Sequence, residues 1–299
     1  MKLSVQSGEL LDKFGLEDGF RMAKEAGFEA MDINLDHIVS VRQMCEGDLE
    51  GFLKLTDDDL KAAYAETKEL AAKYGITFTQ AHAPFPTWVK DGIANDHMQY
   101  ILEKTIMLCE YLDCPRLVVH EGSLPYGDDD SGTWDYNIKM YTGLIPALKK
   151  YGVQCCLENL FRGHKGLMMP GPCWTADEAV KYVDTLNEIA GETLFGFCLD
   201  IGHALLVKQD IYDFIIKMGP RLTCLHIHDN NGLNDQHLFP YMGAVNWDRF
   251  CQGLKEINYA YDLSFETFAG LRMFDPALAP EVLKLAGATA ALFRSRIVG

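Results

Sequence analysis

The stretch GFCLDIGHA, residues 196–204, carries an apolar run into Asp200 and places His203 three residues later. The run has the composition of a buried strand, because short apolar segments are typical of parallel sheets. A carboxylate at the end of such a strand lies against a low-dielectric core. Its charge is costly there unless a metal ion or a buried arginine offsets it. The sequence therefore raises the question of which positive partner Asp200 has.

Apolar runs of this kind recur through the chain. They cover residues 2–7, 28–35, 76–82, 116–122, 153–159, 195–200, 222–229 and 261–267. Helical stretches separate them, among them 56–75, with Thr56 as N-cap and Gly75 at its end, and 269–299, expected to be the last helix. Eight alternating units predict an α/β fold, a closed (β/α)₈ TIM barrel that forms one domain over residues 1–299. An open doubly wound sheet is the alternative, but neither GxGxxG nor GxxxxGK[ST] follows a strand.

Composition limits the partners of the chain. Its 299 residues include 27 Lys and Arg against 43 Asp and Glu, a formal charge of -16 that repels nucleic acid and anionic membranes. No apolar stretch has the length of a signal peptide or a membrane span. The nine cysteines, several within apolar runs, suit reduced thiols. We expect a cytoplasmic protein that acts on a small molecule. Its oligomeric state is left open, and a homo-oligomer is one of the alternatives.

Two longer segments that follow strands, 124–134 and 161–174, are predicted to be irregular binding loops. The side chains in and near them that could contact a ligand are the aromatic residues Phe85, Trp88, Trp134 and Trp174 and the basic residues Arg162, His164 and Lys165. The aromatic rings could stack on a sugar ring and the basic groups could meet a phosphate. Packing within the loops and exposure to solvent are the alternatives.

Metal-capable side chains end six consecutive strands. They are His82, His120, Glu158, Asp200, His226, His228 and Glu266. The carboxyl ends of the strands share one face of a parallel barrel, so these side chains should converge around its axis. Any one of them could be a hydrogen-bonded structural residue or a helix cap. The whole set has few lysines or arginines beside it and is better explained by a cation.

Carboxylate and imidazole ligands suit Mn²⁺, Mg²⁺, Co²⁺, Fe²⁺ or Zn²⁺, and more than one ion could bind. Asp200 would then be a ligand, and His203 would bind another ion or donate a hydrogen bond to substrate. Asp235 and His237 form a D-x-H pair that could reach one ion from a loop, or a solvated pair.

Three cysteines precede the proposed ligands by two residues: Cys156, Cys198 and Cys224. Side chains two apart on a strand face the same way, so these thiols should point inward one layer below. We interpret them as small barrel fillers rather than as zinc ligands.

These residues resemble the xylose isomerase-like barrel superfamily, which contains sugar phosphate isomerases and epimerases, inosose-type enzymes and endonuclease IV. The likeness spans essentially the whole chain. In the epimerase-like members the metal ligands follow strands five to eight. The resemblance places them at Glu158 in CLENL, Asp200 in CLDIGH, His226 in LHIHD and Glu266 in SFET. It favours His226 over His228 through the family pattern H-x-[NH]-D.

The sequence is also similar to endonuclease IV, which binds three zinc ions through nine ligands. The matching positions are His82, His120, Glu158, Asp200, His203, His226, Asp235, His237 and Glu266. The charge of -16 and the lack of an arginine-bearing loop after the second strand argue against that activity.

The chain also departs from the sugar-converting subgroups. It lacks the arginine that ketose 3-epimerases carry after the strand-seven histidine and the lysine that xylose isomerases carry after the strand-five glutamate. The usual GxG turn keeps only Gly243.

The resemblance implies a divalent-metal-dependent isomerase or epimerase of carbohydrate metabolism, acting on a sugar, sugar phosphate or cyclitol through a metal-stabilised enediolate. Glu158 and Glu266 would be the acid and base, and His203 would donate to a substrate oxygen. A dehydratase of inositol derivatives, a trinuclear zinc phosphodiesterase acting on abasic DNA and a non-catalytic sugar-binding barrel are the alternatives.

Overall fold

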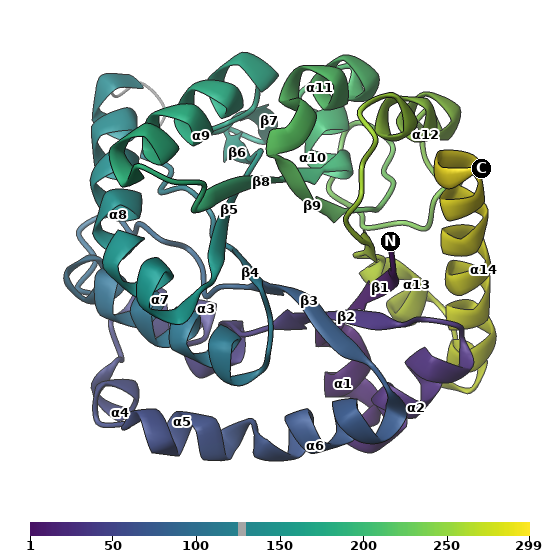
Figure 1. Ribbon diagram of the computed structural model, residues 1–299, viewed down its shortest axis with the longest axis horizontal. Coiled ribbons are helices and arrows are strands. Elements are labelled where there is room, and N and C mark those ends of the chain that lie inside the picture. The colour runs from purple at the N-terminus through teal and green to yellow at the C-terminus, as the bar shows by residue number, and fades with distance from the viewer. Residues whose placement is uncertain (125–129) are drawn as a thin grey trace.

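The computed structural model describes residues 1–124 and 130–299 and has eight parallel strands arranged around a central axis (Figure 1). The strand order is β10-β1-β2-β3-β4-β5-β8-β9. The strands are β1 (Leu3–Gln6), β2 (Ala30–Asn34), β3 (Thr77–His82), β4 (Arg116–Val118), β5 (Gln154–Glu158), β8 (Phe195–Asp200), β9 (Leu222–His226) and β10 (Leu263–Phe265). All eight predicted strands are confirmed, and the doubly wound alternative is wrong.

The ring closes between β9 and β10, just past the end of β9. A parallel bridge joins Ile227 to Phe265. The amide of Ile227 donates to the carbonyl of Ser264 at 2.8 Å, and the amide of Glu266 donates back to the carbonyl of Ile227 at 3.1 Å. This closure, with the helices outside it, confirms the (β/α)₈ barrel and brings His226 beside Glu266.

Helices cover the outside of the strands (Figure 1). They are α1 (Gly8–Phe14), α2 (Leu16–Glu25), α3 (Val41–Glu46), α4 (Glu50–Leu53), α5 (Asp57–Ala63), α6 (Ala65–Tyr74), α7 (Ala94–Tyr111), α8 (Asp130–Tyr151), α9 (Ala176–Ala190), α10 (Ile201–Leu206), α11 (Ile211–Met218), α12 (Trp247–Glu256), α13 (Phe268–Met273) and α14 (Ala279–Val298), with 3-10 turns at Asp36–Ile38, Gly219–Arg221 and Pro276–Leu278. Within the described residues, no helix combines the length and apolarity that a membrane crossing requires.

Two predicted helices are broken in the structure. The helix over 56–75 keeps its Thr56 capping box and its left-handed Gly75, but Tyr64 (φ -105°, ψ 5°) divides it into α5 and α6. The last helix does not begin at residue 269, because Asp275 is extended (ψ 135°) before Pro276. A residue before proline avoids helical geometry, so α13 and α14 are separate helices.

Both segments predicted to be irregular contain regular structure. The segment 161–174 contains the antiparallel hairpin of β6 (Phe161–His164) and β7 (Leu167–Pro170). In the segment 124–134, α8 begins at Asp130, and residues 125–129 lie outside the described part of the chain.

The interior of the barrel is filled by a small cluster separate from the main core. Its members are Val118, Cys156, Cys198 and Cys224, all at most 1% exposed. The thiols of Cys156 and Cys224 lie 3.5 Å apart. The described cysteines form no disulfide. The structure therefore confirms that these three cysteines fill the barrel interior below the strand ends.

We predict that truncating Phe293 of α14 destabilises the barrel strongly. Its fully buried ring stacks on Trp247 with the centroids 5.2 Å apart and lies 6.0 Å from Phe265 of β10. The Phe293→Ala substitution should lower the free energy of unfolding by about 3–5 kcal/mol in denaturant titrations. The neighbouring Leu292→Ala, at a side chain 43% exposed, should change it by less than about 1 kcal/mol. Equal losses for the two variants would contradict the prediction.

Candidate metal centre

A cavity of about 580 Å³ opens at the carboxyl ends of the strands. Its polar floor includes Glu158 and Glu266, which end β5 and follow β10. Aromatic side chains form part of its wall, namely Phe85, Trp88, Phe161 and Phe268. The cavity thus combines charged groups at its base with flat apolar surfaces, as small-molecule sites commonly do.

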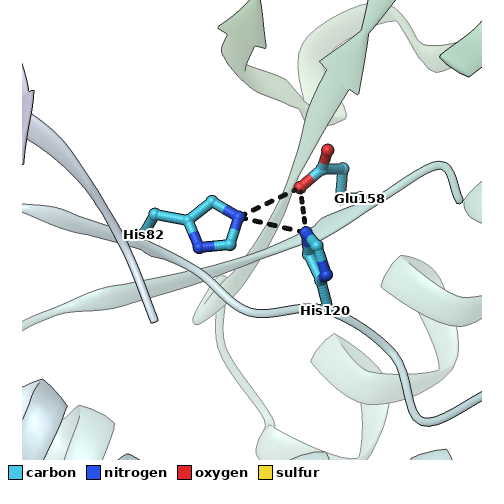
Figure 2. A group of neighbouring side chains, drawn as sticks. All are labelled: His82, His120 and Glu158. Carbon is cyan, nitrogen blue, oxygen red and sulfur yellow. Dashed lines mark hydrogen bonds and ion pairs between the residues drawn. The ribbon is translucent and has the colours of Figure 1, made fainter. Parts of the chain in front are cut away.

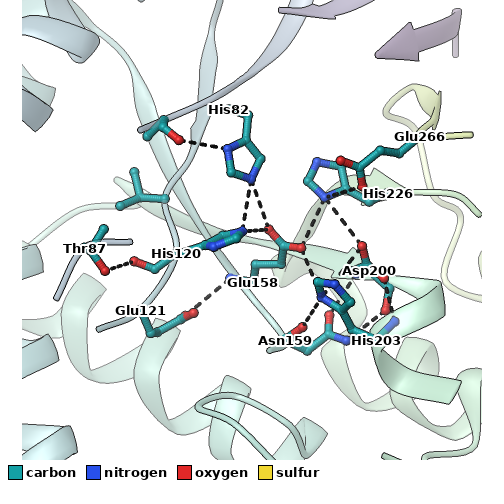
Figure 3. Close-up of polar contacts among 12 residues, drawn as sticks. His82, Thr87, His120, Glu121, Glu158, Asn159, Asp200, His203, His226 and Glu266 are labelled. Carbon is teal, nitrogen blue, oxygen red and sulfur yellow. Dashed lines mark hydrogen bonds and ion pairs between the residues drawn. The ribbon is translucent and has the colours of Figure 1, made fainter. Parts of the chain in front are cut away.

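Three carboxylates predicted from the strand ends meet around one imidazole nitrogen, which belongs to a fourth predicted donor, His226 (Figure 3). The Nδ1 atom of His226 lies 3.2 Å from Glu158 Oε1, 3.8 Å from Asp200 Oδ2 and 3.5 Å from Glu266 Oε2. All four side chains are buried. The other oxygen of Glu158, Oε2, lies near His120 and His82 instead. Three carboxylates and one imidazole that converge in this way fit a divalent cation.

A second donor group shares Glu158 with the first. Figure 2 shows His82, His120 and Glu158 pointing toward one another, with the two Nε2 atoms 3.0 Å apart. The Nε2 atom of His120 lies 3.1 Å from Glu158 Oε2. The Nδ1–H of His82 donates to the carbonyl of Ala83 at 2.8 Å, which leaves Nε2 free to accept a cation. These three residues could therefore hold an ion next to the first.

A third donor group comes from the loop after β9. His237 Nε2 and Asp235 Oδ2 lie 3.0 Å apart, and His203 Nε2 is 3.9 Å from the same oxygen. His228 completes the group, because one of its ring nitrogens lies within 4.8 Å of the donor atoms of Asp235 and His237; its ring also stacks on that of His237, with the centroids 4.0 Å apart. His228 Nε2 also lies 3.0 Å from both oxygens of Asp200. His228 thus belongs to the third group and also contacts Asp200 of the first.

The loop that carries Asp235 and His237 is tied down by the buried carboxylate of Asp229. It accepts backbone N–H bonds from Tyr241, Gly243 and Val245 at 3.1–3.2 Å and one from the indole of Trp247 at 3.1 Å. A Cβ at Gly243 would lie 2.3 Å from this carboxylate and from the carbonyl of Asn230. This close approach explains why a glycine is kept there.

The electrostatics divide the histidines into two kinds. Burial and the neighbouring His120 lower the pKa of His82 to about 4, so its ring is neutral. Burial alone would lower the pKa of His203, but Asp200, Asp235 and Glu158 outweigh it and raise the pKa to about 10. Burial is likewise outweighed at His237, where Asp235 and Glu266 raise the pKa to about 9.

The pKa values of the two glutamates also shift in opposite directions. Burial would raise the pKa of Glu158, but His226 and His120 reverse this and hold it well below its usual value. At Glu266 burial prevails over the histidines and raises the pKa.

The family model for the xylose isomerase-like TIM barrel matches residues 20–287, which is most of the chain. The chain belongs to the xylose isomerase-like TIM barrel family. It is 29% identical over 227 residues to an uncharacterised protein of Methanocaldococcus jannaschii, with 72% of each chain covered. A D-psicose 3-epimerase of Enterocloster bolteae is 31% identical over 94 residues, 31% of this chain and 28% of the epimerase.

Solved structures of this family have the same fold. An L-ribulose 3-epimerase superposes with a TM-score of 0.72 at 17% identity and covers 99% of this chain and 95% of its own. The IolI protein with a bound zinc atom superposes with a TM-score of 0.70 at 18% identity, covering 100% and 98%. At these identities the likeness shows the barrel.

Several polar residues of the site were not predicted from the ends of the strands. Asn159 joins β5 to β8, since its amide donates to the carbonyl of Asp200 and its oxygen accepts the Asp200 N–H, both at 2.8 Å. Its carbonyl also accepts the Nδ1–H of His203 at 3.0 Å. The carboxylate of Glu121 lines the cavity and accepts the N–H of Glu158 at 3.3 Å. Burial raises the pKa of Glu121 well above its usual value.

Three residues predicted to contact substrate lie elsewhere. Trp134, Arg162 and Trp174 line a separate cavity beside the β6–β7 hairpin. Trp134 sits on α8 and packs on Tyr182 with the ring centroids 4.2 Å apart, because the helix begins earlier than predicted.

The basic residues of that segment follow the hairpin as well. Arg162 donates to the carbonyls of Pro170 and Leu124, at 2.7 and 3.0 Å. His164 ends β6, Lys165 lies in the turn, and neither lines the central cavity.

We predict that metal binding strengthens as the pH rises from about 6.5 to about 9. The raised pKa values of His203 and His237 mean that both stabilise the metal-free protein below about pH 6.5 and that this contribution is lost as the pH rises through about 9 to 10. The positive charge of these two rings opposes a cation bound beside them, so each proton lost on binding should raise the apparent affinity by about tenfold per pH unit.

Calorimetric titration of metal-free protein with Zn²⁺ at several pH values measures this slope. A His203→Asn, His237→Asn double variant should show a shallower slope, whereas His82→Asn should leave it unchanged, because the pKa of His82 is about 4. A pH-independent affinity in the unsubstituted protein would contradict the prediction.

Proposed function

We propose that this protein is a divalent-metal-dependent isomerase or epimerase of a sugar or cyclitol. The observation that carries the proposal is the convergence of Glu158, Asp200, Glu266 and His226 at the floor of a cavity that both glutamates line. The similarity to sugar 3-epimerases supports a sugar substrate, and the zinc atom of the IolI structure supports a metal.

A bound divalent ion would supply positive charge to stabilise the negative charge that develops on the substrate carbonyl in an enediolate. The ion would be Mn²⁺, Co²⁺, Mg²⁺ or Zn²⁺, since the donors are carboxylates and imidazole. Glu158, Asp200, His226 and Glu266 would hold it. The approach of three buried carboxylates to one imidazole nitrogen is the local feature that favours this assignment.

Glu158 and Glu266 are the acid and base in this proposal. They come from β5 and from the end of β10, with β8 and β9 between them, so they reach the substrate from different directions. Two bases on different sides of a carbon can remove a proton and return another with inversion. His203, whose ring lies 3.4 Å from Glu158 through Nδ1, would donate from Nε2 to a substrate oxygen.

The rim of the cavity favours a substrate without a phosphate. Glu9 and Asp12 of α1 line it. Among the described residues, Arg272 is the only arginine or lysine in the lining, and its Nε atom lies 2.5 Å from Glu9 Oε1. A phosphate would therefore meet negative charge, whereas sugar hydroxyls find carboxylate acceptors and the flat faces of Phe85 and Trp88.

We predict that Glu158→Gln and Glu266→Gln each lower kcat by about 10²–10⁴-fold, the contribution expected of a positioned acid or base. The assay is interconversion of free ketoses and inososes by metal-loaded protein, followed by chromatography. Glu110→Gln, an exposed position on α7, should retain full activity. Phosphate esters of the same sugars should react with a kcat/KM lower by about tenfold or more. Full turnover by both site variants would exclude the proposed roles.

A second function, a trinuclear zinc phosphodiesterase acting on abasic DNA, is favoured by one observation. Besides the four central donors, His82 and His120 join Glu158, and Asp235, His237 and His228 form a further group. Three ions could therefore bind. The acidic rim and the charge of -16 oppose the approach of DNA, which places this function behind the first.

We predict that the metal-loaded protein does not cleave an abasic-site duplex. Elemental analysis of the purified protein, combined with a gel assay of the labelled duplex, checks this. Three zinc ions per chain together with strand cleavage would reverse the order of the two functions. Sugar binding that persists in Glu158→Gln and Glu266→Gln without any turnover in the unsubstituted protein would favour a binding barrel.

A further inference from the structure

We propose that Asp32 is a positioning residue that orients the imidazole of His226 toward the metal donors; the inference rests on the proposed metal-dependent function. Asp32 lies in the middle of β2, between Met31 and Ile33, and is fully buried inside the barrel. It does not belong to any of the three donor groups described above. It would instead act on the metal ligand His226, through the ring nitrogen that faces away from the metal donors.

The contact with His226 defines that role. His226 Nδ1 faces Glu158, Asp200 and Glu266, whereas its Nε2 points the opposite way and lies 3.2 Å from Asp32 Oδ2. A histidine that binds a cation through Nδ1 must carry its proton on Nε2. A carboxylate beyond that proton fixes the ring orientation and makes the ligand nitrogen more basic. Asp32 is in position to do both.

A glutamine holds the carboxylate in place. Gln80 of β3 donates through Nε2 to Asp32 Oδ2 at 2.7 Å and to the carbonyl of Leu225 at 3.2 Å. Because both acceptors require an N–H, the amide of Gln80 cannot turn its oxygen toward Asp32. The oxygen that contacts His226 is therefore the same one that Gln80 anchors.

The remaining contacts argue against a purely structural acid. Among the described residues, His226 is the only group that forms an ion pair with Asp32, and no lysine or arginine reaches it. The Oδ1 atom of Asp32 and the Nε2 atom of His226 are both buried without a well-aligned hydrogen bond. A buried carboxylate with so few partners is costly, and a serine or alanine would fill the position at lower cost. Polarisation of His226 would explain why a charged carboxylate occupies position 32.

The test is calorimetric titration of metal-free protein with Mn²⁺. Asp32→Asn keeps the shape and an acceptor oxygen but removes the charge, and we expect it to bind Mn²⁺ about 10–100-fold more weakly. Asp32→Glu retains the charge on a longer side chain and should recover part of the affinity. Gln80→Met removes the anchor but keeps the carboxylate, and its loss should fall between those of the unsubstituted protein and Asp32→Asn.

A stability control separates positioning from folding. Asn187→Ala removes three hydrogen bonds at the opposite end of β8, to Leu194 and Phe195, and should lower the melting temperature without changing Mn²⁺ affinity. If Asp32→Asn and Gln80→Met bind Mn²⁺ within twofold of the unsubstituted protein, the positioning role is overturned while the metal site stands. If the unsubstituted protein binds none of Mn²⁺, Co²⁺, Mg²⁺ and Zn²⁺ in such titrations, the proposed function fails, and this inference fails with it.

Discussion

Mutual repulsion among buried carboxylates is the constraint on which this end of the barrel depends. Glu158, Asp200 and Glu266 approach one imidazole within 4 Å, and Asp32 lies behind the same ring. Such a cluster is stable only if positive charge is placed inside it. The metal-free chain supplies that charge through protonated histidines, and the proposed ion would replace those protons. The same acids that repel one another without a cation would therefore favour the binding of one.

The barrel satisfies this constraint by joining neighbouring strand ends. Asn159 joins the ends of β5 and β8, and the Ile227–Phe265 bridge closes β9 on β10. The four strands that these two connections join carry the four central donors at their ends. The apolar packing below them, including the thiols of Cys156, Cys198 and Cys224, excludes water and keeps the local dielectric low. The connections between the strands hold the donors together, and the apolar packing strengthens the electrostatic interactions among them.

Sequence patterns predicted the eight strands and the donors at their ends, because strand period and polar termination are local features. Asp32 was missed although an acid between Met31 and Ile33 in an apolar strand is itself a signal, since strand interiors rarely hold an unpaired charge. The hairpin after β5 and the early start of α8 were missed because their pairing and packing depend on neighbours far along the chain. Trp134 consequently lies against Tyr182 rather than in the central cavity.

The single carboxylate of Asp229 has an implication for how this scaffold can diverge. It gathers the chain on both sides of the segment that bears Asp235 and His237, and the backbone of Asp229 pairs with Leu238, so residues 231–236 form an excursion with fixed ends. Insertions or deletions there can alter the third group of donors without disturbing β9 or α12. The third donor group could thus change while the barrel is preserved.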